Sequence, residues 1–340
     1  MPHRITVEPS GHQFSAEPGN TVLRAALDAG VNLPYGCRNG ACGACKGRVL
    51  AGQVDRGPYM EGALSDAEVA QGYALFCCAR PLSDLTIACR EAGGTREIPL
   101  RTLPCRVQRL ERVAADVMVM SLTLPASERL QFVAGQYIDF LLKDGRRRSF
   151  SLANAPHDDA CLQLHVRHIP GGQFTGHVFA GLRERDILRF DGPHGDFCMQ
   201  ESSTKPAILV AGGTGFAPLK SMIEDALQRR PCRPMTLYWG ARDRAGLYLG
   251  RLAEAWRDRG VGYVPVLSEP RADDRWDGRT GLVHEAVMSD LPDLSGHQAY
   301  VCGTPAMVEA ARRDFIRRCG LKEEDFFADS FSFAAESNPA

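Results

Sequence analysis

The chain has 340 residues, of which 44% are hydrophobic and 24% charged, and its formal net charge is −1. This length favours two or three domains, and this composition argues against a disordered, collagen-like or coiled-coil chain. The balance of 40 basic and 41 acidic residues argues against a nucleic-acid partner, and no apolar run reaches the length of a membrane span. Because the N-terminus lacks the apolar core of a secretory signal, we expect a cytoplasmic protein.

The first expected domain, residues 1–93, is short and β-rich. Apolar residues recur at helical spacing within 21–29, and Ser65 with Glu68 forms a capping box that opens a second short helix. The glycine pair at 93–94 then predicts a linker that reaches about residue 101.

A cysteine motif in this domain carries the strongest signal. Cys37-Arg-Asn-Gly-Ala-Cys42-Gly-Ala-Cys45 has the C-x4-C-x2-C spacing of a [2Fe–2S] site, which needs one more distant cysteine. The loop glycines let the backbone fold around a cluster and bring amide groups close to its sulfurs. The fourth ligand is Cys77 or Cys78, and spacing alone does not separate the two. Zinc or four unrelated cysteines are the alternatives, but zinc usually takes paired C-x2-C halves and only one is present.

These cysteines resemble the cluster ligands of plant-type ferredoxins, whose last ligand is followed by three residues and then proline. The resemblance implies a β-grasp ferredoxin domain. It places the fourth ligand at Cys77, four residues before Pro81, so that the cluster is held by Cys37, Cys42, Cys45 and Cys77.

Residues 101–200 predict a small antiparallel β-barrel, because hydrophobic alternation and turns recur at short spacing. Arg146-Arg-Arg-Ser-Phe-Ser151 lies upstream of Pro170-Gly-Gly-Gln-Phe-Thr-Gly176, in which two glycines precede an expected helix start at Thr175. Free amide groups and the helix dipole at such a start suit a phosphate. His165 and His168 fall on opposite faces of a strand, which argues against a shared metal.

These two segments resemble the R-x-[YF]-[ST] motif and the glycine-rich helix start of the ferredoxin–NADP reductase superfamily. The resemblance implies an FAD domain in which Arg148 contacts the pyrophosphate, Phe150 packs on the isoalloxazine and Ser151 hydrogen-bonds its hydride-accepting nitrogen. Phe150 is often Tyr in that superfamily, so about 1 kcal/mol of hydrogen bonding is absent here. The implied flavin-binding residues are Arg148, Ser149, Phe150, Ser151, Gly171, Gly172 and Thr175.

Residues 205–333 alternate apolar strands with helices and predict an α/β domain with a parallel sheet. The run 207–211 reads as a buried strand, and Gly212-Gly-Thr-Gly-Phe-Ala-Pro218 follows it and opens a helix. This loop departs from G-x-G-x-x-G but resembles the G-G-T-G-x-A-P of the same superfamily, which implies a nicotinamide nucleotide site. The implied residues are Gly212, Gly213, Thr214, Gly215, Pro218, Arg242, Asp243, Cys302 and Gly303.

Within this site Cys302 is expected beside the nicotinamide, as a catalytic residue together with Ser151, although an inert buried thiol is the alternative. Asp243 favours NADH because it can accept from a ribose hydroxyl and repel a phosphate, whereas Arg242 and Arg244 could pair with the 2′-phosphate of NADPH, which stays possible. Phe331 lies in a terminal segment that resembles family tails ending near the flavin. A final edge strand is the other interpretation of that segment.

The order ferredoxin, flavin, nucleotide resembles the reductase components of bacterial aromatic-ring oxygenases. Within that group the stretches 134–139, 147–156, 276–284 and 327–331 most resemble CDP-6-deoxy-Δ-3,4-glucoseen reductases. The resemblance implies an NADH-dependent reductase in which FAD accepts two electrons from NAD(P)H and passes them singly to the cluster. The cluster then reduces a transiently docked iron protein, an oxygenase or a dehydrase. The alternatives are a non-catalytic redox sensor or electron-transfer module and a simple flavin reductase.

Overall fold

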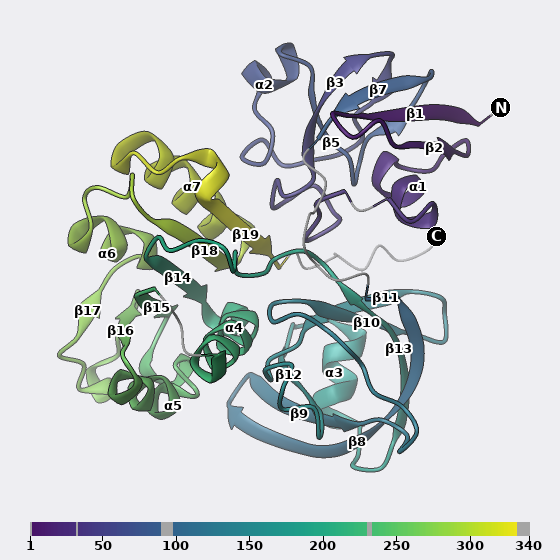
Figure 1. The fold of residues 1–340 in the computed structure, drawn as a ribbon. Helices are drawn as coiled ribbons and strands as arrows, with labels where there is room; N and C mark the ends of the chain where they lie inside the picture. The colour runs from purple at the N-terminus through teal and green to yellow at the C-terminus, as the bar shows by residue number, and fades with distance from the viewer. Residues whose placement is uncertain (1, 32, 90–97, 230–232, 332–340) are drawn as a thin grey trace. The chain divides into compact units, whose positions relative to one another are not determined.

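The computed structural model describes residues 2–31, 33–89, 98–229 and 233–331. The chain forms two compact units, which are described separately (Figure 1). The first contains residues 1–96 together with the short segments 195–197 and 328–332, and the second contains the remaining residues. Of the linker expected from the glycine pair 93–94 to about residue 101, residues 93–97 lie outside the described residues, and residues 98–100 form neither helix nor strand.

The first unit is built on a mixed five-stranded sheet with the order β2-β1-β7-β3-β5. β1 pairs parallel with β7, whereas β1–β2, β3–β7 and β3–β5 are antiparallel. β4 and β6 form a separate two-stranded antiparallel sheet. The strands of this unit are β1 (His3–Glu8), β2 (Gln13–Ala16), β3 (Lys46–Ala51), β4 (Val54–Asp55), β5 (Tyr73–Leu75), β6 (Arg80–Pro81) and β7 (Leu85–Ala88), and its helices are α1 (Val22–Asp28) and α2 (Asp66–Ala70).

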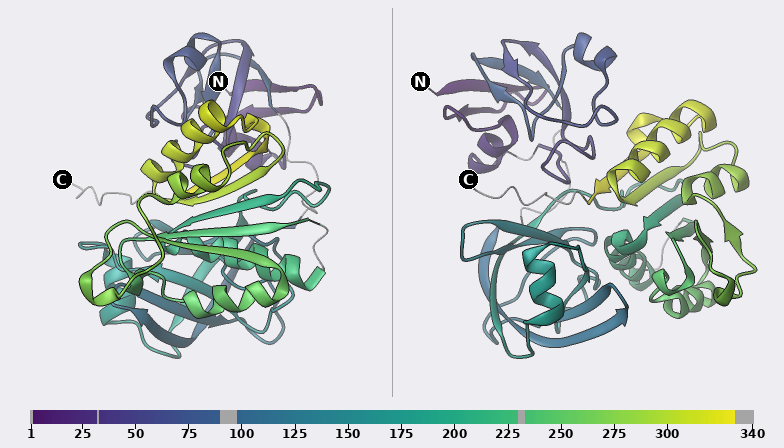
Figure 2. Two further views of the ribbon diagram at one scale, coloured as in Figure 1. Left: turned by 90° about the vertical axis from the view of Figure 1, so that its left-hand side faces the viewer. Right: turned by 180° about the vertical axis from the view of Figure 1, so that it is seen from behind.

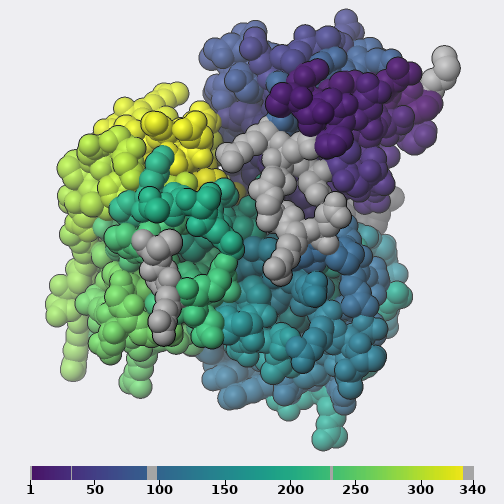
Figure 3. All heavy atoms as spheres, viewed as in Figure 1, coloured from purple at the N-terminus to yellow at the C-terminus, as the bar shows by residue number. Residues whose placement is uncertain are grey.

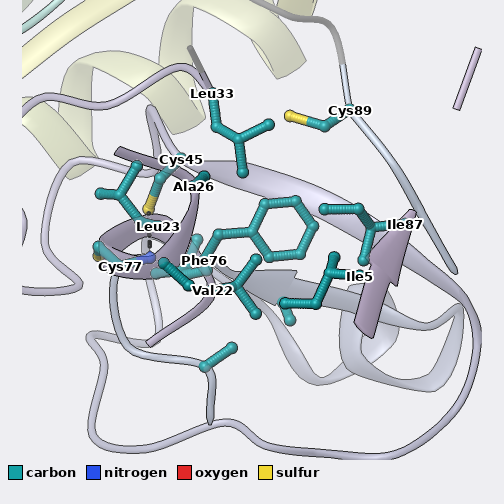
Figure 4. Close-up of a cluster of buried hydrophobic side chains, with 14 of the residues drawn as sticks. Ile5, Val22, Leu23, Ala26, Leu33, Cys45, Phe76, Cys77, Ile87 and Cys89 are labelled. Carbon is teal, nitrogen blue, oxygen red and sulfur yellow. Dashed lines mark hydrogen bonds between the residues drawn. The ribbon is translucent and has the colours of Figure 1, made fainter. Parts of the chain in front are cut away.

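Local sequence signals explain both helices of this unit. Thr21 caps α1 by accepting from the Arg24 amide, and the capping box expected from Ser65 and Glu68 is present at the start of α2. α1 packs on the sheet through a buried face that includes Val22 and Ala26, which Figure 4 shows beside the fully buried ring of Phe76. Segments 29–31 and 33–45, which lie between α1 and β3, contain no helix or strand.

The second unit begins with a six-stranded antiparallel barrel of order β11-β10-β13-β8-β9-β12. An isolated bridge between Leu152 and Leu164 joins its two ends. α3 lies against the barrel (Figure 2). Its Phe174 and Val178 are buried and belong to the barrel core. Figure 3 shows the face of the barrel that is turned to the viewer in Figure 1 with all its heavy atoms drawn. The elements are β8 (Arg101–Ala114), β9 (Val117–Thr123), β10 (Tyr137–Leu141), β11 (Arg147–Ser151), β12 (Leu162–Arg167), α3 (Gln173–Ala180) and β13 (Ile187–His194).

The rest of this unit is an α/β layer on a six-stranded sheet of order β17-β16-β15-β14-β18-β19. The pairs β14–β15, β14–β18, β15–β16 and β16–β17 are parallel, as the alternation of strands and helices predicts. The strands are β14 (Ala207–Gly212), β15 (Met235–Ala241), β16 (Val261–Leu267), β17 (Arg279–Thr280), β18 (Gln298–Gly303) and β19 (Phe326–Ser330). The last three residues of β19, 328–330, belong to the first unit. The helices are α4 (Phe216–Arg229), α5 (Gly250–Ala255), α6 (Val283–Asp290) and α7 (Pro305–Cys319), with 3-10 turns at η1 (Gly213–Gly215), η2 (Arg244–Gly246), η3 (Trp256–Arg259), η4 (Ala272–Asp274) and η5 (Glu323–Asp325).

One expected helix boundary is wrong. α3 begins at Gln173, two residues before the expected start at Thr175. Gly172 adopts an extended conformation and serves as the N-cap, so the helix starts as soon as the glycine pair ends. Within the described residues, no helix is both long and apolar enough to cross a membrane.

Candidate functional site

The loop before β3 brings the three motif cysteines together under a set of backbone amides. Cys37 Sγ accepts from the amides of Ala41 and Cys42 at 3.4 and 3.3 Å, and Cys42 Sγ accepts from those of Cys37 and Ala44 at 3.4 Å. Gly40 and Gly43 have φ values of +77° and +76°, which only glycine adopts freely. Sulfurs surrounded by amide donors are the environment that thiolate ligands of an iron–sulfur cluster require.

The fourth sulfur comes from the turn after β5. The Cys77 amide donates to Cys45 Sγ at 3.4 Å, and Figure 4 shows these two residues together, with Cys89 on the other side of the Phe76 ring. Cys78 Sγ lies 3.5 Å from Cys77 Sγ and is buried to the same extent. Both neighbours are thus close to the loop, but the hydrogen bond to a motif cysteine comes from Cys77.

Two carboxylates near this loop were not anticipated from the sequence. Asp329 Oδ1 lies 3.3 Å from the position that a Cβ on Gly36 would occupy, and the Asp196 amide donates to the Tyr35 carbonyl. Burial and the nearby Cys37 raise the pKa of Asp329 to about 7, and burial raises the pKa of Asp196 to about 7. The Cys42 thiol and amides of the loop lower the pKa of Cys37 to about 6, although burial opposes this shift. No local motif predicts either carboxylate, because Asp196 and Asp329 lie more than 160 positions further along the chain than Tyr35 and Gly36, which they approach.

Strand β11 presents the expected flavin-binding residues. Ser151 ends the strand, and its hydroxyl oxygen is buried without a hydrogen-bond partner among the described residues. A buried hydroxyl that lacks a partner is costly, so this atom fits a ligand that supplies a hydrogen-bonding nitrogen. The residues present therefore fit a flavin ring at this strand end.

The other residues of β11 have more varied environments. Phe150 is half-buried, and its ring centroid lies 5.8 Å from that of Phe140 and 5.4 Å from that of Phe174, so one side of the ring belongs to the barrel core. Ser149 donates its hydroxyl to Asp139 at 2.6 Å, which leaves it engaged with the protein. Arg148 donates to the Arg147 carbonyl at 2.9 Å and is half-buried.

The start of α3 has the open geometry that a phosphate needs. Gly171 has a φ of +78°, and no heavy atom lies within 4 Å of a Cβ built there. Gly172 is the N-cap and makes no side-chain capping bond, while Thr175 Oγ1 accepts from the Ile169 amide at 3.1 Å. The dipole of an uncapped helix start favours an anion.

Strands β10, β11 and β13 share a network of charged side chains that sequence motifs did not predict. Asp139 is fully buried and contacts Arg147 at 3.8 Å and His194 at 3.7 Å, and Arg147 also pairs with Asp191. Burial alone would raise the pKa of Asp191, but hydrogen bonds from His194 and Arg147 lower this pKa below its usual value. The three groups Asp139, Asp191 and His194 are close enough to hold a metal ion. Because the Arg147 guanidinium already pairs with both carboxylates, an ion-pair network is the better interpretation.

The glycine loop after β14 meets the end of β18. A Cβ on Gly215 would lie 2.1 Å from the carbonyl oxygen of Cys302, and a Cβ on Gly303 would lie 3.3 Å from the Cα of Gly212. Gly213 has a φ of +53°, and Thr214 and Pro218 are buried at the start of the helical run. The structure thus brings the two expected nucleotide-binding segments into contact, and it buries Cys302 fully.

A cluster of aromatic side chains contacts the glycine loop after β14. Trp239 Nε1 donates to the Gly213 carbonyl at 3.0 Å, and its ring stacks on Phe216 with centroids 3.8 Å apart. Tyr248 meets both rings edge-on, and its hydroxyl lies 2.9 Å from His165 Nδ1. Burial and the charge of Lys220 lower the pKa of His165 to about 3, so this histidine is a neutral core residue.

Strand β15 is followed directly by the residues expected to distinguish NADH from NADPH. Asp243 accepts from the Gly246 amide at 3.2 Å and pairs with Arg271 at 2.7 Å. Arg244 donates to the Asp274 carbonyl at 3.0 Å, and Arg242 is exposed. Phe331 follows the edge strand β19 and is half-buried.

Comparison with known proteins matches all three parts of the chain. Family models describe residues 5–82 as a 2Fe-2S iron-sulfur cluster binding domain, residues 104–199 as an oxidoreductase FAD-binding domain and residues 209–313 as an oxidoreductase NAD-binding domain. CDP-6-deoxy-L-threo-D-glycero-4-hexulose-3-dehydrase reductase of Yersinia pseudotuberculosis is 39% identical over 333 residues, which are 97% of this chain and 99% of that protein. The chain belongs to this family of iron–sulfur flavoprotein reductases.

Two further relatives have the same organisation. The reductase subunit of an aromatic O-demethylase from an Amycolatopsis strain is 42% identical over 321 residues, 92% of this chain and 95% of the relative. The crystal structure of the Amycolatopsis cytochrome P450 reductase GcoB matches with a TM-score of 0.78 and 39% identity, covering 98% of this chain and all of that one. The reductase is therefore an NAD(P)H-dependent oxidoreductase that carries electrons through FAD to a [2Fe–2S] cluster, which confirms the expected fold class, cofactors and reaction.

Proposed function

We propose that this reductase uses NADH in preference to NADPH and delivers single electrons to a partner iron protein, either an oxygenase or a dehydrase that acts on a nucleotide-linked deoxysugar. The partner class is supported by the relatives, which are named as a dehydrase reductase and as the reductase subunit of an aromatic O-demethylase. Encounters between electron-transfer proteins are usually small and transient, and we infer the same here.

Two kinds of atom support the assignment of the cofactor-binding residues. The sulfurs of the motif cysteines accept hydrogen bonds from backbone amides, and the buried Ser151 hydroxyl has no partner among the described residues. We propose that Cys37, Cys42, Cys45 and Cys77 hold the cluster, because amides already donate to the sulfurs of the three motif cysteines and the Cys77 amide supplies one of these bonds. Ser151 offers a buried hydroxyl to the flavin ring, and Arg148 with the α3 start binds its pyrophosphate. When bound, FAD accepts two electrons from the nicotinamide and releases them singly.

The preference for NADH is supported by charge at the end of β15. Arg271 pairs with the Asp243 carboxylate, whereas the Arg244 side chain donates to the backbone carbonyl of Asp274, and the Asp274 carboxylate accepts from the Arg244 backbone amide. A 2′-phosphate placed there would bring further negative charge beside these carboxylates, whereas a ribose hydroxyl could donate to Asp243. We expect a higher kcat/KM with NADH than with NADPH, and a higher value with NADPH would contradict this preference.

A pair of substitutions tests the cluster ligands. Cys77→Ser removes the sulfur assigned to the cluster, so the variant should lose the normal iron–sulfur absorbance, whereas Cys78→Ser should keep it. Iron and acid-labile sulfide are measured in both proteins together with bound FAD, which should stay unchanged because the flavin lies in the other unit. The reverse pattern would assign the cluster to Cys78.

A further inference from the structure

Helix α4 carries two buried polar side chains whose hydrogen bonds end on the barrel. Lys220 Nζ donates to the carbonyl oxygen of Ala153 at 3.1 Å, and Ser221 Oγ donates to that of Asn154 at 2.7 Å. Lys220 is 7% exposed and Ser221 is fully buried. Bonds that are shielded from water in this way are costly to lose, because each leaves a buried carbonyl without its donor.

The two carbonyl groups belong to the segment that directly follows Ser151. The barrel fixes this segment from its own side, since the Ala153 amide donates to the Gln163 carbonyl at 2.7 Å and Asn154 Oδ1 accepts from the Gln163 amide at 2.9 Å. Both Ala153 and Asn154 are buried. The end of the flavin-binding strand is therefore held by β12 on one side and by α4 on the other.

The same helix begins at the nucleotide-binding loop. Phe216 starts α4 directly after Gly215, and Lys220 follows one turn later. At 1.5 Å per residue, about 8 Å of helix separate Gly215 from Lys220, which is too short for appreciable bending. Glu224 Oε2 lies 2.7 Å from Lys220 Nζ, so the buried ammonium is paired and its direction is fixed. One rigid element thus connects the loop for the nicotinamide nucleotide to the strand end for the flavin.

We propose that Lys220 and Ser221 are positioning residues for hydride transfer, because they hold the segment after Ser151 against the helix that presents the nucleotide. This inference rests on the proposed flavin and nucleotide sites. In the reaction a hydride, which carries two electrons, leaves C4 of the nicotinamide and bonds to the flavin, so that NADH becomes NAD⁺ and FAD becomes reduced by two electrons. The rate of such a transfer falls steeply when donor and acceptor are displaced.

Ser221→Ala and Lys220→Met, made in the full-length holoprotein, test the proposal. Flavin reduction is followed by anaerobic stopped-flow absorbance with NADH and with NADH deuterated at C4. We expect the limiting rate to fall on the order of tenfold and the isotope effect to rise, because the transfer itself becomes slower, while FAD content and the Kd for NADH stay unchanged. The long-wavelength absorbance of reduced flavin stacked against NAD⁺ should weaken. In flavin-free protein, amide hydrogen exchange should become faster at residues 152–157.

Two control variants separate positioning from folding. Lys220→Arg keeps a donor and a positive charge, so it should recover part of the lost rate. Arg229→Met removes ion pairs to Asp225 and Glu201 at the far end of α4 and should leave the rate unchanged. Ser221→Ala deletes a single oxygen and carries the test if Lys220→Met does not fold.

Two results would exclude the positioning role of Lys220 and Ser221, and a third would exclude the proposed function. If Ser221→Ala and Lys220→Met lower the thermal stability but leave the limiting rate and the long-wavelength absorbance unchanged, the two side chains are structural and the proposal is wrong. If NADH affinity alone is lost, they act on binding and the proposal is also wrong. If the wild-type protein binds no flavin, or its flavin is not reduced by NADH, the proposed function fails instead.

Discussion

Replacement of Gly215 by alanine tests how closely the nucleotide-binding loop approaches β18. The added Cβ would lie 2.1 Å from the carbonyl oxygen of Cys302, 2.5 Å from its carbonyl carbon and 3.0 Å from the Gly303 nitrogen. Ordinary carbon contacts lie at about 3.5–4.0 Å, so the loop or the strand must move by more than about 1 Å. The atoms that are struck belong to the backbone of a strand paired in register with β14, and no side chain can rotate away.

The magnitude follows from this geometry. Overpacking of a core typically costs about 1–3 kcal/mol and occasionally more, and a clash with a strand backbone belongs at the upper end. At about 2–4 °C per kcal/mol for a unit of this size, Gly215→Ala should lower the Tm by about 6–12 °C. Differential scanning calorimetry of the holoprotein measures this shift.

Two matched glycines provide controls. A Cβ on Gly212 would meet the Met307 sulfur at 2.6 Å, which is the far end of a side chain that can move, so Gly212→Ala should cost less than Gly215→Ala. A Cβ on Gly176, inside α3, would meet nothing within 4 Å, so Gly176→Ala should be neutral or stabilising by up to about 1 kcal/mol. Equal Tm values for the variants at 215 and 176 would refute the close approach of the loop to β18.

Three further predictions concern single residues. The pKa of His165 is lowered from 6.5 to about 3, so between these pH values the unfolded chain binds a proton that the folded chain does not. Its contribution to stability is therefore present above about pH 6.5 and is lost as pH falls, by up to about 1.4 kcal/mol per pH unit. His165→Gln, which does not titrate, should flatten this slope in urea unfolding measured at several pH values, and parallel profiles would contradict the prediction. Cys302→Ala should slow flavin reduction by NADH on the order of tenfold in stopped-flow experiments, because Cys302 is expected beside the nicotinamide and the smaller side chain would position the ring less closely, and an unchanged rate would show an inert thiol. Asp243→Ser removes the carboxylate at the end of β15, so the ratio of kcat/KM for NADPH to that for NADH should rise, and an unchanged ratio would place discrimination elsewhere.

The sequence predicted those structural features that depend on a short stretch of chain. The capping box of Ser65 and Glu68 and the apolar run 207–211 are local signals, and the structure has α2 and β14 at these places. The cluster loop is also local, since three of its cysteines lie within nine residues. The choice between Cys77 and Cys78 needed a family pattern because adjacent residues share the same spacing.

What the sequence did not reveal depends on contacts between distant residues. Asp139, Arg147 and Asp191 form their network only because β10 pairs with both β11 and β13, and this register is not visible in any motif. Asp329 lies near Gly36, almost 300 positions away, through folding alone. The hydrogen bonds of Lys220 and Ser221 are likewise invisible, because a lysine and a serine in an amphipathic helix normally predict a solvated face.

The central claim is that electrons from NADH reach the cluster only through the flavin. The most direct test is to mix the anaerobic protein with NADH, with and without its FAD, and to follow the reduced [2Fe–2S] cluster by electron paramagnetic resonance. We predict that flavin-loaded protein develops the signal of the reduced cluster after its flavin is bleached, and that flavin-free protein develops none. A cluster that is reduced equally fast without flavin would show that electrons bypass the flavin, and a cluster that stays oxidised in the loaded protein would show that the flavin does not reduce it.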